Sequence, residues 1–197
     1  MKTMLLLVAL IMLIVTACTN GPADASQFKG TMMPASVPAP DFTFTDAEGQ
    51  EVQLSDYLGQ IVLLYFGYTF CPDVCPTTLS DLKRVQNQVD ESGENVQVIM
   101  ITVDPERDTA DKIAEYVAHF HPNFVGLSGT KEAIDEAADG YGVYYEKHEG
   151  TPATGYLVDH TARVFVIEPD GSHRLSFGFG TPVEDIVADL RLLLRDM

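Results

Sequence analysis

The sequence predicts an α/β fold in which helices pack as a sandwich around a mixed central sheet, with a β-hairpin at the start of the domain. Three observations predict it: apolar runs typical of buried strands, segments of helical periodicity that alternate with them, and turn residues between short alternating segments near both ends of the domain. The chain has 197 residues, 46% hydrophobic and 21% charged, which is enough for one globular domain of ordinary size.

The first elements are a hairpin, a strand and a helix. Residues 42–45 and 52–54 flank the turn-forming residues 46–49, which predicts a small β-hairpin. The uninterrupted apolar run 61–66 lies between two glycines and is typical of a central strand buried on both faces. Apolar residues then recur at helical spacing over 76–89, with a proline suited to the first turn.

The rest of the chain continues the alternation of strands and helices. Residues 147–155, which contain Gly and Pro, predict a loop, and residues 169–171 predict a turn. The other expected elements are strands at 96–103, 124–127, 143–146, 156–159 and 163–168, and helices at 109–120, 131–138 and 183–194.

The N-terminal segment predicts export. An apolar run follows Lys2 and is shorter than the about 20 residues of a membrane-spanning helix, so residues 1–17 are expected to be a signal peptide, with a single-pass anchor as the alternative. Residues 15–18, Val-Thr-Ala-Cys, resemble the lipobox of bacterial lipoproteins, in which the cysteine is acylated. We therefore expect lipidation of Cys18 and a location outside the cytoplasm, anchored to the membrane and facing the periplasm or the cell surface.

The segment after Cys18 predicts a tether rather than a folded element. Residues 18–40 are rich in Gly, Pro, Ala and Ser and show no apolar periodicity, which is typical of an extended linker. We therefore expect a lipoprotein signal peptide at 1–17, a flexible tether at 18–40 and one folded domain at 41–197.

Charge limits the partners. The formal net charge is −17, and removal of Lys2 with the signal peptide leaves 11 basic and 29 acidic residues, a net charge of −18. Nucleic acid is excluded as a partner, because phosphates are neutralised by clustered Lys and Arg and the sequence has no such cluster. The negative charge favours solubility, and the alternative is that it steers a basic partner or gathers metal cations.

Two cysteines remain for the domain once Cys18 is assigned to the lipid. Cys71 and Cys75 follow the first buried strand at the start of a helix, which predicts a thioredoxin-like fold whose helix N-terminus stabilises thiolate. Positions four apart on a helix have Cβ atoms about 5–6 Å apart, whereas an unstrained disulfide prefers roughly 3.5–4.5 Å. The spacing favours two ligands on one metal ion, and a reversible disulfide that gates binding is the alternative.

A third ligand would be a histidine. Two thiolates suit Cu(I), and retention of Cu(II) calls for a harder ligand such as imidazole. His119 and His121 lie at a helix end, and His148 and His173 lie in a loop and a turn, where surface roles are expected. His160 lies between two expected strands, at a boundary that can approach the cysteine loop in a thioredoxin-like fold.

Three segments resemble one known family. Residues 67–78, Gly-Tyr-Thr-Phe-Cys-Pro-Asp-Val-Cys-Pro-Thr-Thr, closely resemble the signature of the Sco/SenC family of copper chaperones. Residues 102–109 match the family's Asp-Pro-Glu-Arg-Asp segment, and residues 158–161 match its Asp-His segment, in the same order and spacing. The resemblance covers roughly residues 40–193, and one departure is Ala110, where many relatives have Pro.

The resemblance implies a thioredoxin-like fold, membrane tethering and a role in assembly of the binuclear copper centre in subunit II of cytochrome c oxidase. It implies that Cys71, Cys75 and His160 bind copper, as Cu(I), Cu(II) or both. We also expect Cys71 and Cys75 to form a redox-active disulfide that switches the site off. Asp73 and Asp104 are candidates to orient the ligands, although a turn role is favoured for them.

Three functions follow from these residues. The favoured one is a non-enzymatic metallochaperone that passes copper to subunit II or another cuproprotein by ligand exchange. The alternative is a thiol-disulfide reductase that keeps the cysteines of that site reduced, in which Cys71 attacks a partner disulfide and Cys75 resolves the mixed disulfide. A peroxiredoxin-like peroxidase would use Cys71 against peroxide and would not need His160. A pure interaction module leaves the matched residues without a role.

Overall fold

A computed structural model describes residues 27–151, 155–195 and 197. The expected signal peptide and the lipidation site Cys18 lie outside the described residues. The elements in chain order are β1 (Thr31–Pro38), β2 (Thr43–Thr45), β3 (Glu51–Gln53), the 3-10 helix η2 (Leu54–Tyr57), β4 (Ile61–Gly67), α2 (Val74–Val89), β5 (Val96–Thr102), α3 (Ala110–Ala118), β6 (Val125–Leu127), α4 (Lys131–Tyr141), β7 (Tyr145–Glu149), β8 (Tyr156–His160), β9 (Arg163–Ile167), β10 (Ser172–Gly178) and α5 (Val183–Leu193).

The central sheet is mixed, as the sequence predicts. Its six strands lie in the order β1-β10-β9-β4-β5-β6. Strands β4, β5 and β6 pair in parallel, whereas β4–β9, β9–β10 and β10–β1 pair antiparallel. Two small sheets, β2–β3 and β7–β8, complete the fold, and the first of them confirms the expected hairpin.

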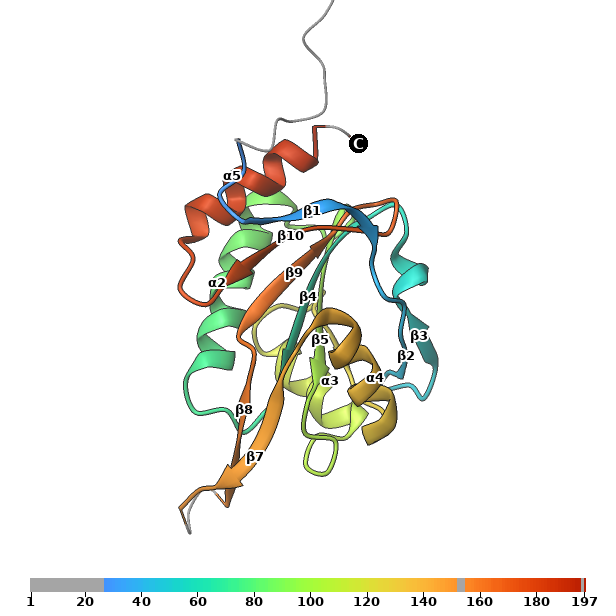
Figure 1. Cartoon of the computed structure of the whole chain (residues 1–197), viewed down its shortest axis with the longest axis vertical. Coiled ribbons are helices and arrows are strands. Elements are labelled where there is room, and N and C mark those ends of the chain that lie inside the picture. The colour runs from blue at the N-terminus through green and yellow to red at the C-terminus, as the bar shows by residue number, and fades with distance from the viewer. Residues whose placement is uncertain (1–26, 152–154, 196) are drawn as a thin grey trace, which may run out of the picture.

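Burial explains why these segments form the core. Every residue of β4 and β5 is buried, as expected of strands covered on both faces. Helices α2 and α5 contact each other on one side of the central sheet, and α4 lies on the other side (Figure 1). There Tyr141 of α4 packs against Phe66 and Phe165. The side chains of Thr109 and Thr130 cap the first turns of α3 and α4 by accepting backbone N–H hydrogen bonds.

The first strand lies within the segment that we expected to be a tether. Residues 31–38 form β1, which pairs with β10 at the edge of the central sheet. The approach to β1 is fixed by Asp189 of α5, whose buried carboxylate accepts hydrogen bonds from the backbone N–H groups of Lys29 and Gly30 at 2.8–3.0 Å. The central sheet therefore includes residues that precede the expected boundary at residue 41. The strand contains prolines, which are confined to sheet edges and weaken the strand signal in the sequence.

Gly30 is needed at this approach. A Cβ atom there would lie 2.8 Å from side-chain atoms of Leu175 and Phe177, closer than real Cβ contacts come. The N-terminal segment can therefore cross β10 closely only with glycine at this position.

The strands expected at 156–159 and 163–168 belong to different sheets. Strand β8 pairs with β7, whereas β9 pairs with β4 and β10. Residues 147–149, expected in a loop, belong to β7, and residues 172–178, for which we expected no strand, form β10. Buried Ser172, His173 and Ser176 interrupt the apolar pattern of β10 and hide it in the sequence.

Two histidines expected at the surface are buried. His121 is 6% exposed and His173 is 7% exposed. The His173 ring packs against Phe165 and Tyr141, with ring centroids 5.5 and 6.1 Å away. Burial lowers the pKa of both imidazoles below the usual 6.5, because a charged ring is poorly solvated there.

We expect His173 to make folding stability depend on pH. Its pKa is lower in the folded than in the unfolded chain, so the unfolded chain binds more protons below about pH 6.5, and the free energy of unfolding falls as the pH drops. One such histidine lowers the free energy of unfolding by at most about 1.4 kcal/mol for each pH unit. Urea unfolding at about pH 7.5 and 5.5 measures this loss.

The variant His173→Leu should lose less stability between these two pH values than the natural chain. His148→Ala, at an exposed position, serves as the control and should retain the full pH dependence. An unchanged pH dependence in His173→Leu would contradict the assignment.

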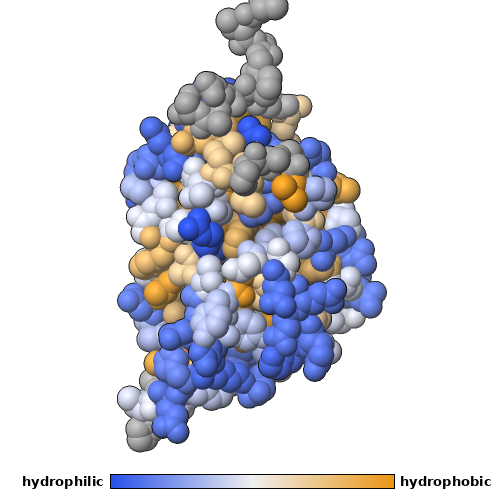
Figure 2. Space-filling view, in the orientation of Figure 1, coloured by the Kyte–Doolittle hydropathy of each residue, from blue (hydrophilic) through white to orange (hydrophobic). Residues whose placement is uncertain are grey.

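The surface is largely hydrophilic around α4 and the β7–β8 hairpin, in the lower part of Figure 2. This agrees with the net charge of −17. Within the part of the chain that the structure describes, no helix has the length and apolar character needed to cross a membrane.

Candidate metal centre

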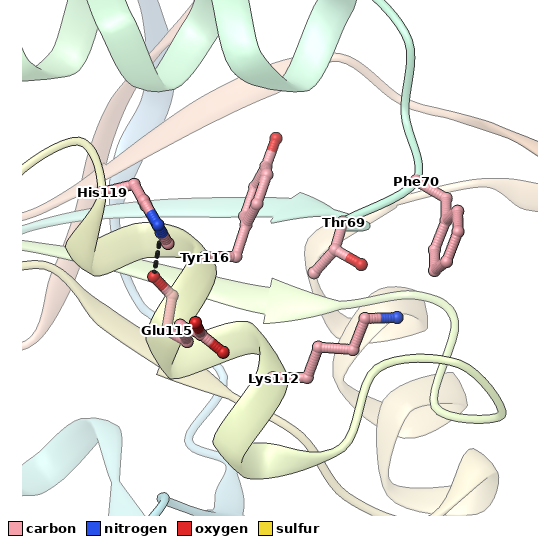
Figure 3. A pocket seen from close by; sticks show the side chains of 6 residues that line it. All are labelled: Thr69, Phe70, Lys112, Glu115, Tyr116 and His119. Atoms are coloured by element: carbon pink, nitrogen blue, oxygen red, sulfur yellow. Dashed lines mark hydrogen bonds between the residues drawn. The ribbon is translucent and has the colours of Figure 1, made fainter.

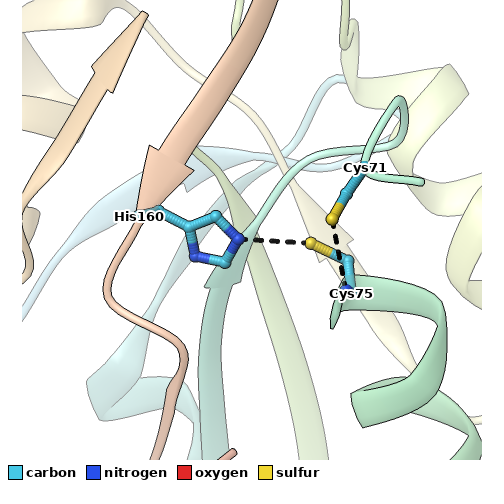
Figure 4. Close-up of side chains that lie close together, drawn as sticks. All are labelled: Cys71, Cys75 and His160. Atoms are coloured by element: carbon cyan, nitrogen blue, oxygen red, sulfur yellow. Dashed lines mark hydrogen bonds between the residues drawn. The ribbon is translucent and has the colours of Figure 1, made fainter. Parts of the chain in front are cut away.

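The two cysteines lie where β4 leads into α2. Cys71 is in the connecting loop and is half-buried, and Cys75 is in the first turn of α2 and is fully buried. His160, the last residue of β8, reaches them from the opposite side (Figure 4). The structure therefore brings together the three residues singled out in the sequence, from two segments 85 residues apart.

The three side chains offer one group of metal ligands. Their ligand atoms, two sulfurs and one imidazole nitrogen, all lie within 4.8 Å of one another. Cys75 Sγ lies 3.4 Å from His160 Nε2, and the Cys75 backbone N–H donates to Cys71 Sγ at 3.3 Å. Both cysteines are free thiols rather than a disulfide in this structure. Gathered in this way, the three atoms form a group that can hold one metal ion.

The floor of the site is built by β4. The Tyr65 hydroxyl donates a hydrogen bond to Cys75 Sγ at 3.4 Å. At Gly67, an added Cβ atom would lie 3.0 Å from the same sulfur and 2.8 Å from the Tyr65 ring. The glycine at the end of the strand therefore leaves room for the sulfur, and the tyrosine orients it.

The two thiols differ in acidity. The pKa of Cys71 is lowered, first because its thiolate accepts a hydrogen bond from the Cys75 thiol, with His160 and backbone N–H groups at the start of α2 acting in the same direction. The pKa of Cys75 is raised by the neighbouring Cys71 thiolate and by burial. Without a metal the pair therefore shares one proton, with the negative charge on the more accessible sulfur.

The orientation of His160 is fixed by its surroundings. Its Nδ1 atom lies 3.4 Å from the carbonyl oxygen of Thr161, and in the tautomer protonated at Nδ1 the ring donates to this carbonyl and the Nε2 lone pair is free for a metal. Tyr65 and Tyr68 place their rings edge-on to the imidazole, with centroids 5.9 and 6.0 Å away. A hydrogen bond from the ring nitrogen that does not bind the metal, here Nδ1, is typical of histidines that bind metals.

The other candidates lie elsewhere. His119 is exposed at the C-terminal cap of α3, and neither it nor His121, His148 or His173 joins a group of three metal ligands among the described residues. Asp73 is exposed at the start of α2. Asp104 is fully buried, and its carboxylate contacts Arg107, Lys147 and Tyr156 rather than the three ligands. No sequence signal marked Tyr65 as a site residue, since it lies in the apolar run 61–66, and Tyr68 and Arg107 were marked only by their places in the matched segments 67–78 and 102–109.

An open cavity of about 260 Å³ adjoins the cysteine loop (Figure 3). Phe70 lies at its edge and is half exposed, and the Lys112 ammonium lies 4.0 Å from the centre of the Phe70 ring. Its lining residues are Thr69, Phe70, Lys112, Glu115, Tyr116 and His119. The cavity therefore borders the metal centre without contributing a ligand to it.

The fold and the site together define a thioredoxin-like protein with a Cys-Cys-His metal-binding group at the start of α2. The family model for SCO1/SenC matches residues 31–195, and the chain belongs to that family. The match begins where β1 begins, in agreement with the structure.

Relatives and solved structures agree with this assignment. Protein SCO1 homolog, mitochondrial, of Homo sapiens is 39% identical over 156 residues, which are 78% of this chain and 52% of that protein. The Mus musculus SCO2 homolog is 38% identical over 159 residues, 80% of this chain and 62% of that protein. The chain thus spans about half to three fifths of these curated relatives.

Two solved structures show the same fold. Apo Sco1 from Thermus thermophilus has a TM-score of 0.76 and 42% identity, covering 86% of this chain and 99% of that chain. Arabidopsis thaliana ScoI with copper bound has a TM-score of 0.76 and 34% identity, covering 82% of this chain and 100% of that chain.

Proposed function

We propose that the protein is a membrane-anchored copper metallochaperone that delivers copper to the binuclear copper site of cytochrome c oxidase subunit II or of a similar cuproprotein. The observation that carries the proposal is the group of two sulfurs and one imidazole nitrogen that lie within 4.8 Å of one another. The subunit II recipient is taken from the family resemblance.

The ligand set suits copper in both oxidation states. Thiolate sulfur favours Cu(I), and imidazole is a usual ligand of Cu(II). The structures of Arabidopsis thaliana ScoI and yeast Sco1 were each determined with copper bound, and they are 34% and 30% identical to this chain. Copper is the cargo in this proposal, and Cys71, Cys75 and His160 are its ligands.

The accessibility of the ligands supports transfer by ligand exchange. Cys71 and His160 are partly exposed, whereas Cys75 is fully buried. A recipient's thiolate can therefore approach the metal from the side of Cys71, and Cys75 would be the last ligand to leave. No electrons are exchanged in this step, because one Cu–S bond forms as another breaks.

The anchor is proposed from the sequence alone. Residues 1–17 would be the signal peptide and Cys18 the acylated N-terminus of the mature protein. The tether would be shorter than expected, because β1 begins at Thr31. The folded domain would then work close to the membrane surface, outside the cytoplasm.

We expect the copper-loaded protein to transfer Cu(I) to a reduced apo-acceptor. The full chain is loaded with one Cu(I) per molecule in detergent and mixed with an acceptor domain whose binuclear copper site carries two reduced cysteines. Copper should appear on the acceptor after the proteins are separated. The metal-free chain with added Cu(I)-chelator complex is the control, and transfer no faster than from that complex would contradict the proposal.

A second function is favoured by the unequal thiols. Cys71 is the accessible thiolate and Cys75 the buried thiol, an arrangement suited to disulfide reduction. Cys71 would attack the acceptor disulfide, and Cys75 would then displace the acceptor, leaving a Cys71–Cys75 disulfide and a reduced acceptor. Mixing the metal-free chain with oxidised acceptor tests this, and an acceptor that stays oxidised would exclude it.

A further inference from the structure

The β7–β8 hairpin carries His160 but is not a strand pair of the central sheet. Among the described residues its two strands form a separate sheet, which projects from the body of the molecule (Figure 1). The position of the imidazole relative to the sulfurs therefore depends on what attaches this hairpin to the segment that carries Cys71.

Asp104 is the first attachment. Its side chain is completely buried, and the residue lies two positions after the end of β5. The Tyr156 hydroxyl, from β8, donates to this carboxylate at 2.5 Å, and the Lys147 ammonium, from β7, lies 3.8 Å away. One buried carboxylate thus contacts side chains from both strands of the hairpin. Lys147 also pairs with Glu106 at 2.7 Å, which adds a contact to the same loop.

Arg107 is the second attachment. Its Nε atom donates to Asp104, and its Nη1 atom donates to the backbone carbonyl of Tyr156 at 3.0 Å. The guanidinium carbon lies 3.6 Å from the centre of the Tyr156 ring and 4.7 Å from that of Phe70. Arg107 therefore lies between the hairpin with His160 and the loop with Cys71, since Phe70 precedes that cysteine.

We infer that Asp104 and Arg107, with Tyr156 and Phe70, form a latch that holds the hairpin against the cysteine loop and thereby positions His160 as the third copper ligand. The inference rests on the proposed function, because it takes His160 to be a ligand. Asp104 and Arg107 are positioning residues, since neither contacts Cys71, Cys75 or the imidazole in the structure.

Arg107 is the residue whose substitution tests the latch best, because it contacts Asp104, Tyr156 and Phe70. A planar guanidinium can bond to the carboxylate and to the carbonyl while it stacks on a ring, which a lysine ammonium cannot do together. Arg107→Leu removes all of these contacts and leaves Asp104 with the hydroxyl of Tyr156 and with Lys147. Tyr156→Phe is the milder change, because it keeps the ring and removes only the hydroxyl that donates to Asp104.

The experiment measures Cu(II) and Cu(I) affinity and the electron paramagnetic resonance of Cu(II) on the full chain in detergent. For Arg107→Leu we expect about 10- to 100-fold weaker Cu(II) binding, as is typical when a partner outside the ligand set is lost, together with loss of the nitrogen coupling from imidazole. Cu(I), which two thiolates can hold, should be affected less. Tyr156→Phe should show a smaller loss in the same direction.

A second comparison tests whether Arg107 acts through His160. If it does, Arg107→Leu combined with His160→Ala should bind Cu(II) no more weakly than His160→Ala alone. The matched control is Arg174→Leu. Arg174 is a partly buried arginine of β10, outside the β7–β8 hairpin, that pairs with Glu168 and lies 5.5 Å from the centre of the Phe28 ring. The control should keep natural affinity and nitrogen coupling.

Two results would overturn the latch: natural Cu(II) affinity and spectrum in Arg107→Leu, or losses that add in the double variant. Should Arg107→Leu fail to fold, Tyr156→Phe decides, and an unchanged Cu(II) affinity there overturns the latch as well. If the Cu(II) spectrum of the natural chain shows no nitrogen coupling from imidazole, that result instead overturns the assignment of His160 as a ligand, and with it the proposed ligand set.

Discussion

The variant Cys75→Ser is expected to lose Cu(I) binding, with an affinity more than about 100-fold below that of the natural chain. Loss of a partner outside the ligand set typically weakens metal binding about 10- to 100-fold, so removal of a ligand itself should cost more. A serine hydroxyl is a poor ligand for Cu(I), which prefers soft sulfur. Competition with a Cu(I) chelator of known affinity measures the change.

Cys75 is the better cysteine to substitute in this test, because it is fully buried and accepts a hydrogen bond from the Tyr65 hydroxyl. Serine can still accept the hydrogen bond from the Tyr65 hydroxyl, so the fold should survive, and urea unfolding monitored by circular dichroism checks this. Ser80→Ala, on the exposed side of α2, is the control and should bind Cu(I) as the natural chain does. Natural Cu(I) affinity in a folded Cys75→Ser protein would be incompatible with the two-sulfur site.

The variant His160→Ala is expected to separate the two oxidation states. Cu(II) binding should fall more than about 100-fold, because the nitrogen ligand itself is lost, and copper delivery should weaken. Cu(I) binding should fall much less, because two thiolates suffice for a linear Cu(I) site. Reduction of a disulfide by the Cys71–Cys75 pair should be largely retained. Titration with Cu(II) and with Cu(I) under reducing conditions measures the two affinities.

The matched control for His160→Ala lies on the same hairpin. His148 is exposed on β7, where its Nδ1 atom lies 3.5 Å from Asp159. His148→Ala should leave both copper affinities unchanged, which shows that any loss in His160→Ala comes from the ligand and not from the hairpin. Undiminished Cu(II) affinity in His160→Ala would remove His160 from the ligand set.

Local sequence predicted the central part of the fold well. Strands β4 and β5 are buried at every position, so their apolar runs were unambiguous, and α2 follows from the spacing of its apolar residues. Strands β1 and β10 were missed because what makes them strands is their pairing with each other and with β9. Prolines in one and buried polar residues in the other obscure the alternation on which a prediction depends.

The sequence by itself determined the chemistry of this protein. Cys71 and Cys75 are only four positions apart, in the loop and the first helical turn where β4 leads into α2, so their proximity is a local feature of that junction. His160 was singled out by resemblance, since nothing local tells a histidine at the end of one strand which distant loop it will face. Only the tertiary structure placed its Nε2 atom 3.4 Å from the Cys75 sulfur. That distance depends on how the β7–β8 hairpin is held, through contacts between residues about 50 positions apart such as Asp104 and Tyr156.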